Sequence, residues 1–168
     1  MLTPTTGKIT LGVLDWPTTA GSNGQVLTSN GSSAATWTSA GALQPRNTAA
    51  ATTASLANLA TGNITITGFK GYALYKIQTS GASWVRLYTD VASRSADSAR
   101  LEGVDPLPGS GVIAEVITTG AETILISPGI FGFSGESPTT TAIPATVTNK
   151  TGGTTTITVT VTILQLEA

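Results

Sequence analysis

The chain has 168 residues, 32 of them threonine, and its eight basic and nine acidic residues give a formal net charge of −1. It contains neither cysteine nor histidine, which excludes disulfides, thiol nucleophiles, Ser-His-Asp triads and the usual zinc, haem and iron–sulfur ligands. Only 10% of the residues are charged, so the chain lacks the basic surface that nucleic-acid binding requires.

Hydropathy and β-propensity narrow the fold class. The sequence contains no run of about 18 apolar residues, so no transmembrane helix is predicted, and its start does not read as a signal peptide. The abundance of Thr, Val and Ile favours strands, since β-branched side chains fit a pleated surface. We therefore expect an all-β protein with no cofactor and no metal, which binds neither nucleic acid nor a membrane.

Large apolar residues are distributed unevenly along the chain. Residues 1–62 hold 13 of them (Val, Ile, Leu, Met, Phe, Trp or Tyr), whereas residues 63–168 hold 33. The first part is too poor in core-forming residues to fold compactly by itself. We predict an anchoring arm over residues 1–40, an Ala/Thr-rich linker over 41–62 and a head domain over 63–168.

The arm is predicted to contain one strand over residues 8–16, which Pro17 ends because proline has no N–H to donate. Residues 24–39 predict a small β-hairpin, since Asn30-Gly31 is a strong two-residue turn signal. An isolated hairpin is marginal in water, so we expect the arm to pack against another chain. The apolar side chains expected at this arm interface are Leu11, Val13, Trp16, Val26, Leu27 and Trp37.

The linker has two interpretations of similar weight. Residues 49–62 place Leu56 and Leu59 at the i,i+3 spacing of a short helix. Thr and Asn are poor helix formers, however, and an extended segment fits equally well.

The head is predicted to be an antiparallel, jelly-roll-like β-sandwich. Short strand-like segments recur between Gly, Pro and Ser turns, as expected for a sandwich or jelly roll. They cover residues 63–68, 71–80, 83–90, 112–119, 122–128, 141–149 and 154–166, with an eighth piece near 129–133.

The last of these segments has the clearest pattern. Its aliphatic residues alternate with threonines, which places one set in the core and the other on the outer face. The aliphatic set is Ile157, Val159, Val161 and Ile163. After Ile163 the phase breaks and Leu164 and Leu166 fall on the threonine face. A β-bulge or a subunit contact would explain the break.

Around residue 86, Val85 and Leu87 alternate with Trp84, Arg86 and Tyr88. With the aliphatic pair in the core, the other three share the opposite face. That face is either a contact surface between subunits or a cation–π cluster covered by a loop. The residues predicted as head subunit contacts are Trp84, Arg86, Tyr88, Leu164 and Leu166.

Seven of the 17 charged residues lie within residues 86–105. Residues 91–100 suit a helical turn, and the charges there alternate in sign. We predict an ion-pair network that fixes a loop and comprises Asp90, Arg94, Asp97, Arg100, Glu102 and Asp105. Calcium binding and carboxylate catalysis are the weaker alternatives, because the spacing of an EF-hand loop is missing. No catalytic residue is expected.

Two stretches resemble a known class of proteins. The sequence GSNGQVLTSNGSSAATW (21–37), preceded by LDWP (14–17), resembles a segment of fibre and appendage proteins of tailed bacteriophages. Residues 71–90 and 103–120, with the Thr-rich last segment, look like a β-domain of virion proteins of phages that infect marine cyanobacteria. The resemblance implies a homotrimeric, non-enzymatic structural protein. It transfers no binding residues.

From the residues and the resemblance together we expect a short fibre, neck appendage or capsid decoration protein, located in the virion and assembled in the bacterial host cytoplasm. Its arm would dock on other virion proteins, and its head would project outward. The alternative is a lectin-like tip that binds a host surface glycan. An enzyme such as a depolymerase is the least favoured reading.

Overall fold

The computed structural model describes residues 10–11, 14–29, 31, 34–40 and 44–168. The chain forms two compact units, residues 1–44 and residues 45–168. The boundary therefore follows Gln44, and residues 45–62 belong to the second unit.

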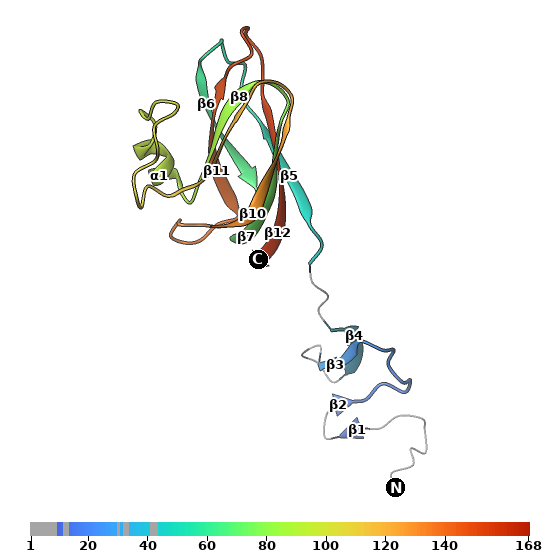
Figure 1. Ribbon diagram of the computed structural model, residues 1–168. Coiled ribbons are helices and arrows are strands. Elements are labelled where there is room, and N and C mark those ends of the chain that lie inside the picture. The colour runs from blue at the N-terminus through green and yellow to red at the C-terminus, as the bar shows by residue number, and fades with distance from the viewer. Residues whose placement is uncertain (1–9, 12–13, 30, 32–33, 41–43) are drawn as a thin grey trace. The chain divides into compact units, whose positions relative to one another are not determined.

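The described residues of the second unit form eight strands and one short helix (Figure 1). Their bounds are β5 (Asn47–Thr52), β6 (Thr61–Thr67), β7 (Gly71–Thr79), β8 (Ser83–Tyr88), α1 (Val91–Ala96), β9 (Val112–Thr118), β10 (Thr123–Phe133), β11 (Ala142–Asn149) and β12 (Thr158–Glu167). The predicted strands are confirmed, and the segments predicted at 122–128 and 129–133 join into the single strand β10.

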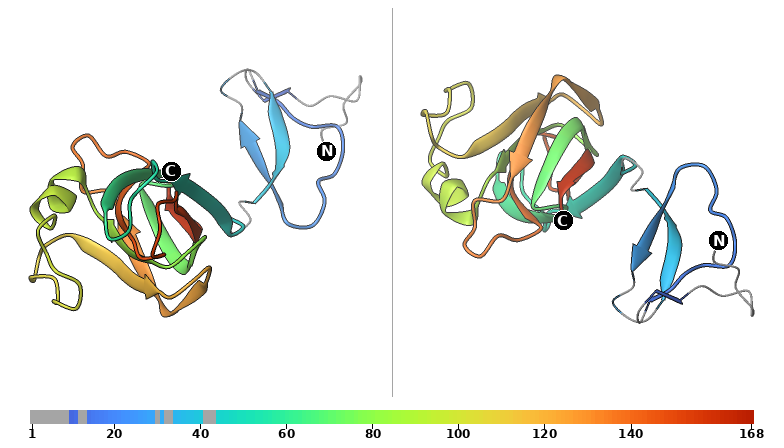
Figure 2. Two further views of the ribbon diagram at one scale, coloured as in Figure 1. Left: turned by 90° about the horizontal axis from the view of Figure 1, so that it is seen from above. Right: turned by 90° about the horizontal axis from the view of Figure 1, so that it is seen from below.

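The strand order is that of a jelly roll. The two sheets have the orders β10-β7-β12-β5 and β6-β11-β8-β9. The pairs β5/β12, β6/β11, β7/β10 and β8/β9 are all antiparallel. The chain is thus one long hairpin rolled into a sandwich, which confirms the predicted fold class. Figure 2 shows the two sheets facing each other, with α1 outside the sandwich.

The core lies between the two sheets, and β12 contributes to it as its sequence pattern predicts. Ile157, Val159, Val161 and Ile163 are each at most 1% exposed. The threonines between them occupy the outer face, where Thr158 bonds to Thr52 of β5 through their hydroxyls at 2.8 Å.

The alternation of β12 continues unbroken through Leu164. The register of β12 against β7 shifts between Thr162 and Ile163, but the residue left without a partner there is Tyr75, so the extra residue lies in β7. Ile163 is therefore in the core and Leu164 on the outer face, as neighbouring residues of a strand are. The bulge predicted from the sequence does not explain the position of Leu164; the extra residue in β12 comes later, at Leu166, between Gln165 and Glu167.

The expected linker contains a strand of the head. Residues 47–52 form β5, which pairs along β12. The helical interpretation is therefore wrong for this segment, and the extended one holds for its conformation, although the segment belongs to the head and not to a linker. The small side chains of Ala49 and Ala51 pack against the core. Pairing with a strand about 110 residues away decides the conformation, and local propensity cannot reveal that partner.

The described part of the first unit consists of short antiparallel pairs. Strand β1 (Thr10–Leu11) pairs with β2 (Leu14–Asp15), and β3 (Gln25–Ser29) pairs with β4 (Ala35–Ser39). The predicted hairpin is confirmed, although Asn30 of its turn lies outside the described residues. The single strand predicted over 8–16 is wrong, because the chain reverses between Leu11 and Leu14.

Candidate functional site

The densest group of polar side chains lies on the outer face of β8. Trp84, Arg86 and Tyr88 point away from the core yet are only 5%, 1% and 1% exposed. Helix α1 contacts β8, and the residues that follow the helix bond to this face. The prediction that these three side chains form a subunit contact is therefore wrong. Their own chain covers them, as in the alternative of a loop-covered cation–π cluster.

The carboxylate of Asp97 is the centre of this buried cluster. Its Oδ2 accepts hydrogen bonds from Tyr88 Oη at 2.7 Å, Arg86 Nη1 at 3.1 Å and Arg100 Nη2 at 3.1 Å. Its Oδ1 accepts a 2.7 Å bond from Arg100 Nε. Arg86 also donates to the backbone carbonyl of Asp97. Side chains from a strand and a loop thus converge on one residue at the end of α1.

Two further side chains complete the cluster. The guanidinium of Arg86 lies 3.9 Å from the centre of the Trp84 ring, and that of Arg100 lies 5.4 Å from it. Arg100 also forms a 2.5 Å ion pair with Glu115 of β9. Two cations therefore face two anions and one aromatic ring, so the buried charges balance.

Electrostatic interactions move the pKa values of Asp97 and Tyr88 away from neutrality, so each side chain keeps one protonation state near pH 7. Burial disfavours the charged form of Asp97, but hydrogen bonds from Arg100 and Tyr88 outweigh it and lower the pKa of this carboxyl. Burial, followed by the bond to Asp97, raises the pKa of Tyr88 to about 12. Both oxygens of the Asp97 carboxylate accept hydrogen bonds from Tyr88 or the two arginines, so the carboxylate is occupied by structural bonds.

The predicted ion-pair network is only partly present. Asp97 and Arg100 pair with each other, whereas Glu102 pairs with Lys150. Arg94 instead donates to the carbonyl of Ile64 at 3.2 Å. Within residues 44–168, Asp105 has no ion-pair partner and is exposed. The network is therefore smaller than predicted and includes residues far away in the sequence.

Asp90 has a different role from the predicted one. Its side chain caps the first turn of α1 and accepts a 2.6 Å bond from the backbone N–H of Ser93. That bond and one from the Thr89 hydroxyl lower the pKa of Asp90. An acceptor at this position satisfies a helix N–H that has no intrahelical partner, so Asp90 fixes the start of the covering segment.

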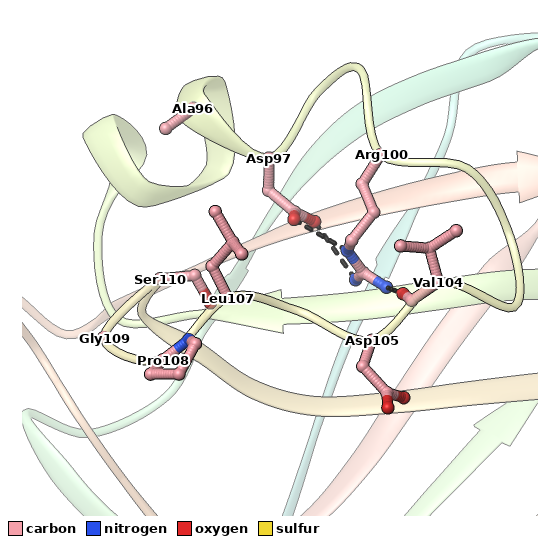
Figure 3. A pocket seen from close by; sticks show the side chains of 9 residues that line it. All are labelled: Ala96, Asp97, Arg100, Val104, Asp105, Leu107, Pro108, Gly109 and Ser110. Carbon is pink, nitrogen blue, oxygen red and sulfur yellow. Dashed lines mark hydrogen bonds and ion pairs between the residues drawn. The ribbon is translucent and has the colours of Figure 1, made fainter.

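A cavity of about 390 Å³ lies beside the cluster (Figure 3). It is lined by Ala96, Asp97, Arg100, Val104, Asp105, Leu107, Pro108, Gly109 and Ser110. Asp97 and Arg100 bond to each other in its wall.

Among the residues that the structure describes, no three His, Cys, Asp or Glu side chains are grouped as a metal site would need. In the same part of the chain, no helix is long and apolar enough to cross a membrane.

Exposed apolar residues form the second notable feature of the head. Phe131 and Phe133 of β10 are 72% and 60% exposed. They line part of another cavity, of about 450 Å³, together with Leu107 and Pro108 of the loop before β9. Our sequence reasoning missed both rings. The alternation Phe131-Gly132-Phe133 was the available signal, since it places the two rings on one face of a strand.

Leu164 and Leu166, predicted as subunit contacts, lie on the outer face or at the end of β12. Leu164 is half-buried and Leu166 is 56% exposed. The structure holds a single chain, so their role as contacts stays a prediction.

The arm residues differ in how far their own unit covers them. Trp37 is half-buried, packs on Gly21 and donates from Nε1 to the carbonyl of Thr19 at 2.8 Å. Leu27 is half-buried, whereas Val26 and Trp16 are 45% and 38% exposed. Of the remaining predicted interface residues, Val13 and the side chain of Leu11 lie outside the described part. The arm interface stays a prediction.

No protein-family model matches the chain, and no curated protein matches it. The fold and the buried cluster define a jelly-roll protein whose densest charged group contributes to its architecture.

Proposed function

We propose that the protein is a non-enzymatic structural component of a tailed-phage virion. Three copies form a surface appendage, such as a short fibre, a neck appendage or a capsid decoration. Residues 1–44 dock on other virion proteins, and the jelly-roll unit is the head.

The observation that carries this proposal is the contrast in burial between the two units. Among the residues of this unit whose burial the structure describes (15–29, 31, 34–40 and 44), Ala35 is the one buried apolar residue. Trp16 and Val26 remain exposed there. A two-stranded hairpin with so little core is marginal in water, so this unit is stabilised by a partner.

The head supports the same proposal. The eight-stranded jelly roll is a fold of viral capsid proteins, as well as of lectins and cupins. Fold alone does not establish function. Here it agrees with the resemblance of residues 21–37, 71–90 and 103–120 to phage virion proteins. The charged residues that could act in catalysis, Asp97 and Arg100, are bonded to each other.

Labelled antibodies against the head, applied to purified particles of the phage that encodes the chain, test the location. We expect electron microscopy to show the label at one type of site on intact particles. Label that stays with unassembled protein and never on particles would contradict the virion role.

A lectin-like tip is the second candidate, and the cavity next to β10 favours it. That cavity is lined in part by Phe131, Phe133, Thr89 and Ser110, and apolar pockets with a few polar groups are usual ligand sites. A glycan array probed with the full chain separates the candidates. Saturable binding at micromolar concentration would place the lectin reading first.

A further inference from the structure

The outer face of the sheet β10-β7-β12-β5 changes character along its length. Toward one end it presents hydroxyls, as at Thr158 and Thr160 of β12. Toward the other end, Phe131, Ala73 and Leu164 are direct Cα partners on three adjacent strands. Phe133 of β10 and Leu166 of β12 lie beyond this row toward the same end of the sheet, where Phe133 pairs with Gly71 and Leu166 is the extra residue of a bulge. We call these five residues the apolar strip.

The strip is open to solvent except where its own members cover each other. Ala73 is only 8% exposed, because it lies between Phe131 and Leu164. Phe131, Phe133 and Leu166 are 72%, 60% and 56% exposed. Exposed apolar surface that is contiguous, rather than scattered singly, marks interaction sites.

The size of the strip fits a protein interface. A covered aromatic side chain buries about 150–250 Å², so the two rings at 72% and 60% exposure leave on the order of 250 Å² uncovered. A standard interface needs roughly 500 Å² of apolar area from each partner. With its leucines, the strip supplies most of that area.

The charges beside the strip indicate what covers it. On one side, Lys76 pairs in register with Leu125, and on the other, Glu167 pairs with Gly71. Within residues 44–168, neither Lys76 nor Glu167 has an ion-pair partner. In a ring of copies, the cation on one side of the strip can pair with the anion on the other side of the next copy's strip, as the head-to-tail contact of a trimer requires.

We propose that the apolar strip binds a second copy of this chain and is the head's contact surface in the oligomer. The inference rests on the self-assembly included in the proposed function, and it deepens that function by assigning the surface. Phe131 is central to the contact, and Lys76 and Glu167 pair across it at its margins.

The test compares two variants of the full chain by sedimentation equilibrium. Phe131→Glu places a charge in the strip, whereas Gln78→Glu places the same charge on an exposed position of β7 at the hydroxyl end of the same sheet. We expect Phe131→Glu to weaken self-association about 30-fold or more, as for a central interface residue. Gln78→Glu should keep the wild-type mass. Circular dichroism should be unchanged in both variants.

The outcomes separate this inference from the proposed function. A wild-type chain that stays monomeric at micromolar concentration contradicts self-assembly itself. A wild-type oligomer that Phe131→Glu leaves intact overturns the strip alone, since another surface then holds the copies together. Glycan binding that Phe131→Glu abolishes, with unchanged mass, would assign the strip to a sugar instead.

A second readout uses the absence of cysteine from the chain. An environment-sensitive fluorophore attached to Leu166→Cys should shift its emission to shorter wavelength as the protein assembles, and the same label on Gln78→Cys should not. Equal spectra for both labels in the assembled state would overturn the proposal.

Discussion

The hydroxyl of Tyr88 donates a 2.7 Å hydrogen bond to Oδ2 of Asp97, the oxygen that also accepts from Arg86 at 3.1 Å. Tyr88 and Arg86 lie on β8, whereas Asp97 ends the short helix α1. One carboxylate therefore fastens the covering segment to the sheet. This explains how three side chains on the outer face of a sandwich are as buried as its core.

Replacing Asp97 by Asn should destabilise the head strongly. The amide removes the charge that balances Arg86 and Arg100, and an uncompensated buried charge costs about 3–5 kcal/mol. Urea unfolding followed by tryptophan fluorescence measures the loss. The matched control is Asp105→Asn, at an exposed carboxylate of the same segment, which should stay within about 0.5 kcal/mol of the wild type. Equal stability of the two variants would show that Asp97 does not fasten the loop.

The same carboxyl should make the head sensitive to acid. Its pKa is lower in the folded chain than the value of about 3.9 expected when unfolded, so its stabilising effect is complete above that value. The effect is lost as the pH falls through the folded pKa. Unfolding midpoints measured from pH 7 to pH 2 should therefore drop below about pH 4. In Asp97→Asn the drop of the unfolding midpoint at acidic pH should be smaller. The same drop in the variant and the wild type would contradict the role of Asp97 in the acid sensitivity.

The sequence predicted most of the head because its strands carry their own pattern. The alternation from Ile157 to Ile163 revealed the core face of the last strand. The sequence could not decide whether Trp84, Arg86 and Tyr88 form a subunit contact or a cluster covered by a loop, because the covering group, Asp97, is held there by tertiary bonds alone.

The predicted start of the head at residue 63 is wrong for a related reason. Residues 47–52 read as Asn-Thr-Ala-Ala-Ala-Thr, which has no alternation of large apolar and polar residues. Their strand conformation comes from β12, at the other end of the chain. Likewise, the partner of Glu102 is Lys150, 48 residues away, and no local spacing connects the two.

The corrected boundary makes a prediction about fragments. A fragment of residues 45–168 retains β5 and should unfold cooperatively with a midpoint within a few degrees of the head in the full chain. A fragment of residues 63–168 lacks β5. Strand β12 then becomes an edge strand whose backbone groups are unpaired along the stretch that includes Val159 and Val161. Such edges promote aggregation, and we expect the shorter fragment to be insoluble or to melt at lower temperature. Differential scanning calorimetry of both fragments decides, and equal melting curves would restore the boundary near residue 62.

Gly132 is predicted to be essential for the packing of Tyr72. A Cβ at Gly132 would lie 2.3 Å from Cζ of Tyr72, which is 1% exposed and cannot move aside freely. Gly132→Ala should therefore cost about 1–3 kcal/mol, as overpacking does in other cores. Gly120→Ala, where a Cβ meets nothing within 4 Å, is the matched control. A thermal midpoint for Gly132→Ala as high as that of the control would contradict the close contact.

The alternation of β12 predicts opposite consequences for two adjacent residues. Ile163 is fully buried and Leu164 lies on the outer face, next to Ala73 in the apolar strip. Ile163→Ala should lower the free energy of unfolding by about 2–5 kcal/mol, because it leaves a cavity in the core. Leu164→Ala removes the same kind of side chain from a half-buried position, so its effect on unfolding of the dilute monomer should be clearly smaller. Its main effect should be on self-association, since Leu164 belongs to the strip proposed to bind a second copy.

Urea unfolding at low protein concentration, combined with sedimentation at high concentration, measures both effects. If Leu164→Ala were as destabilising as Ile163→Ala, Leu164 would not lie on the outer face of β12.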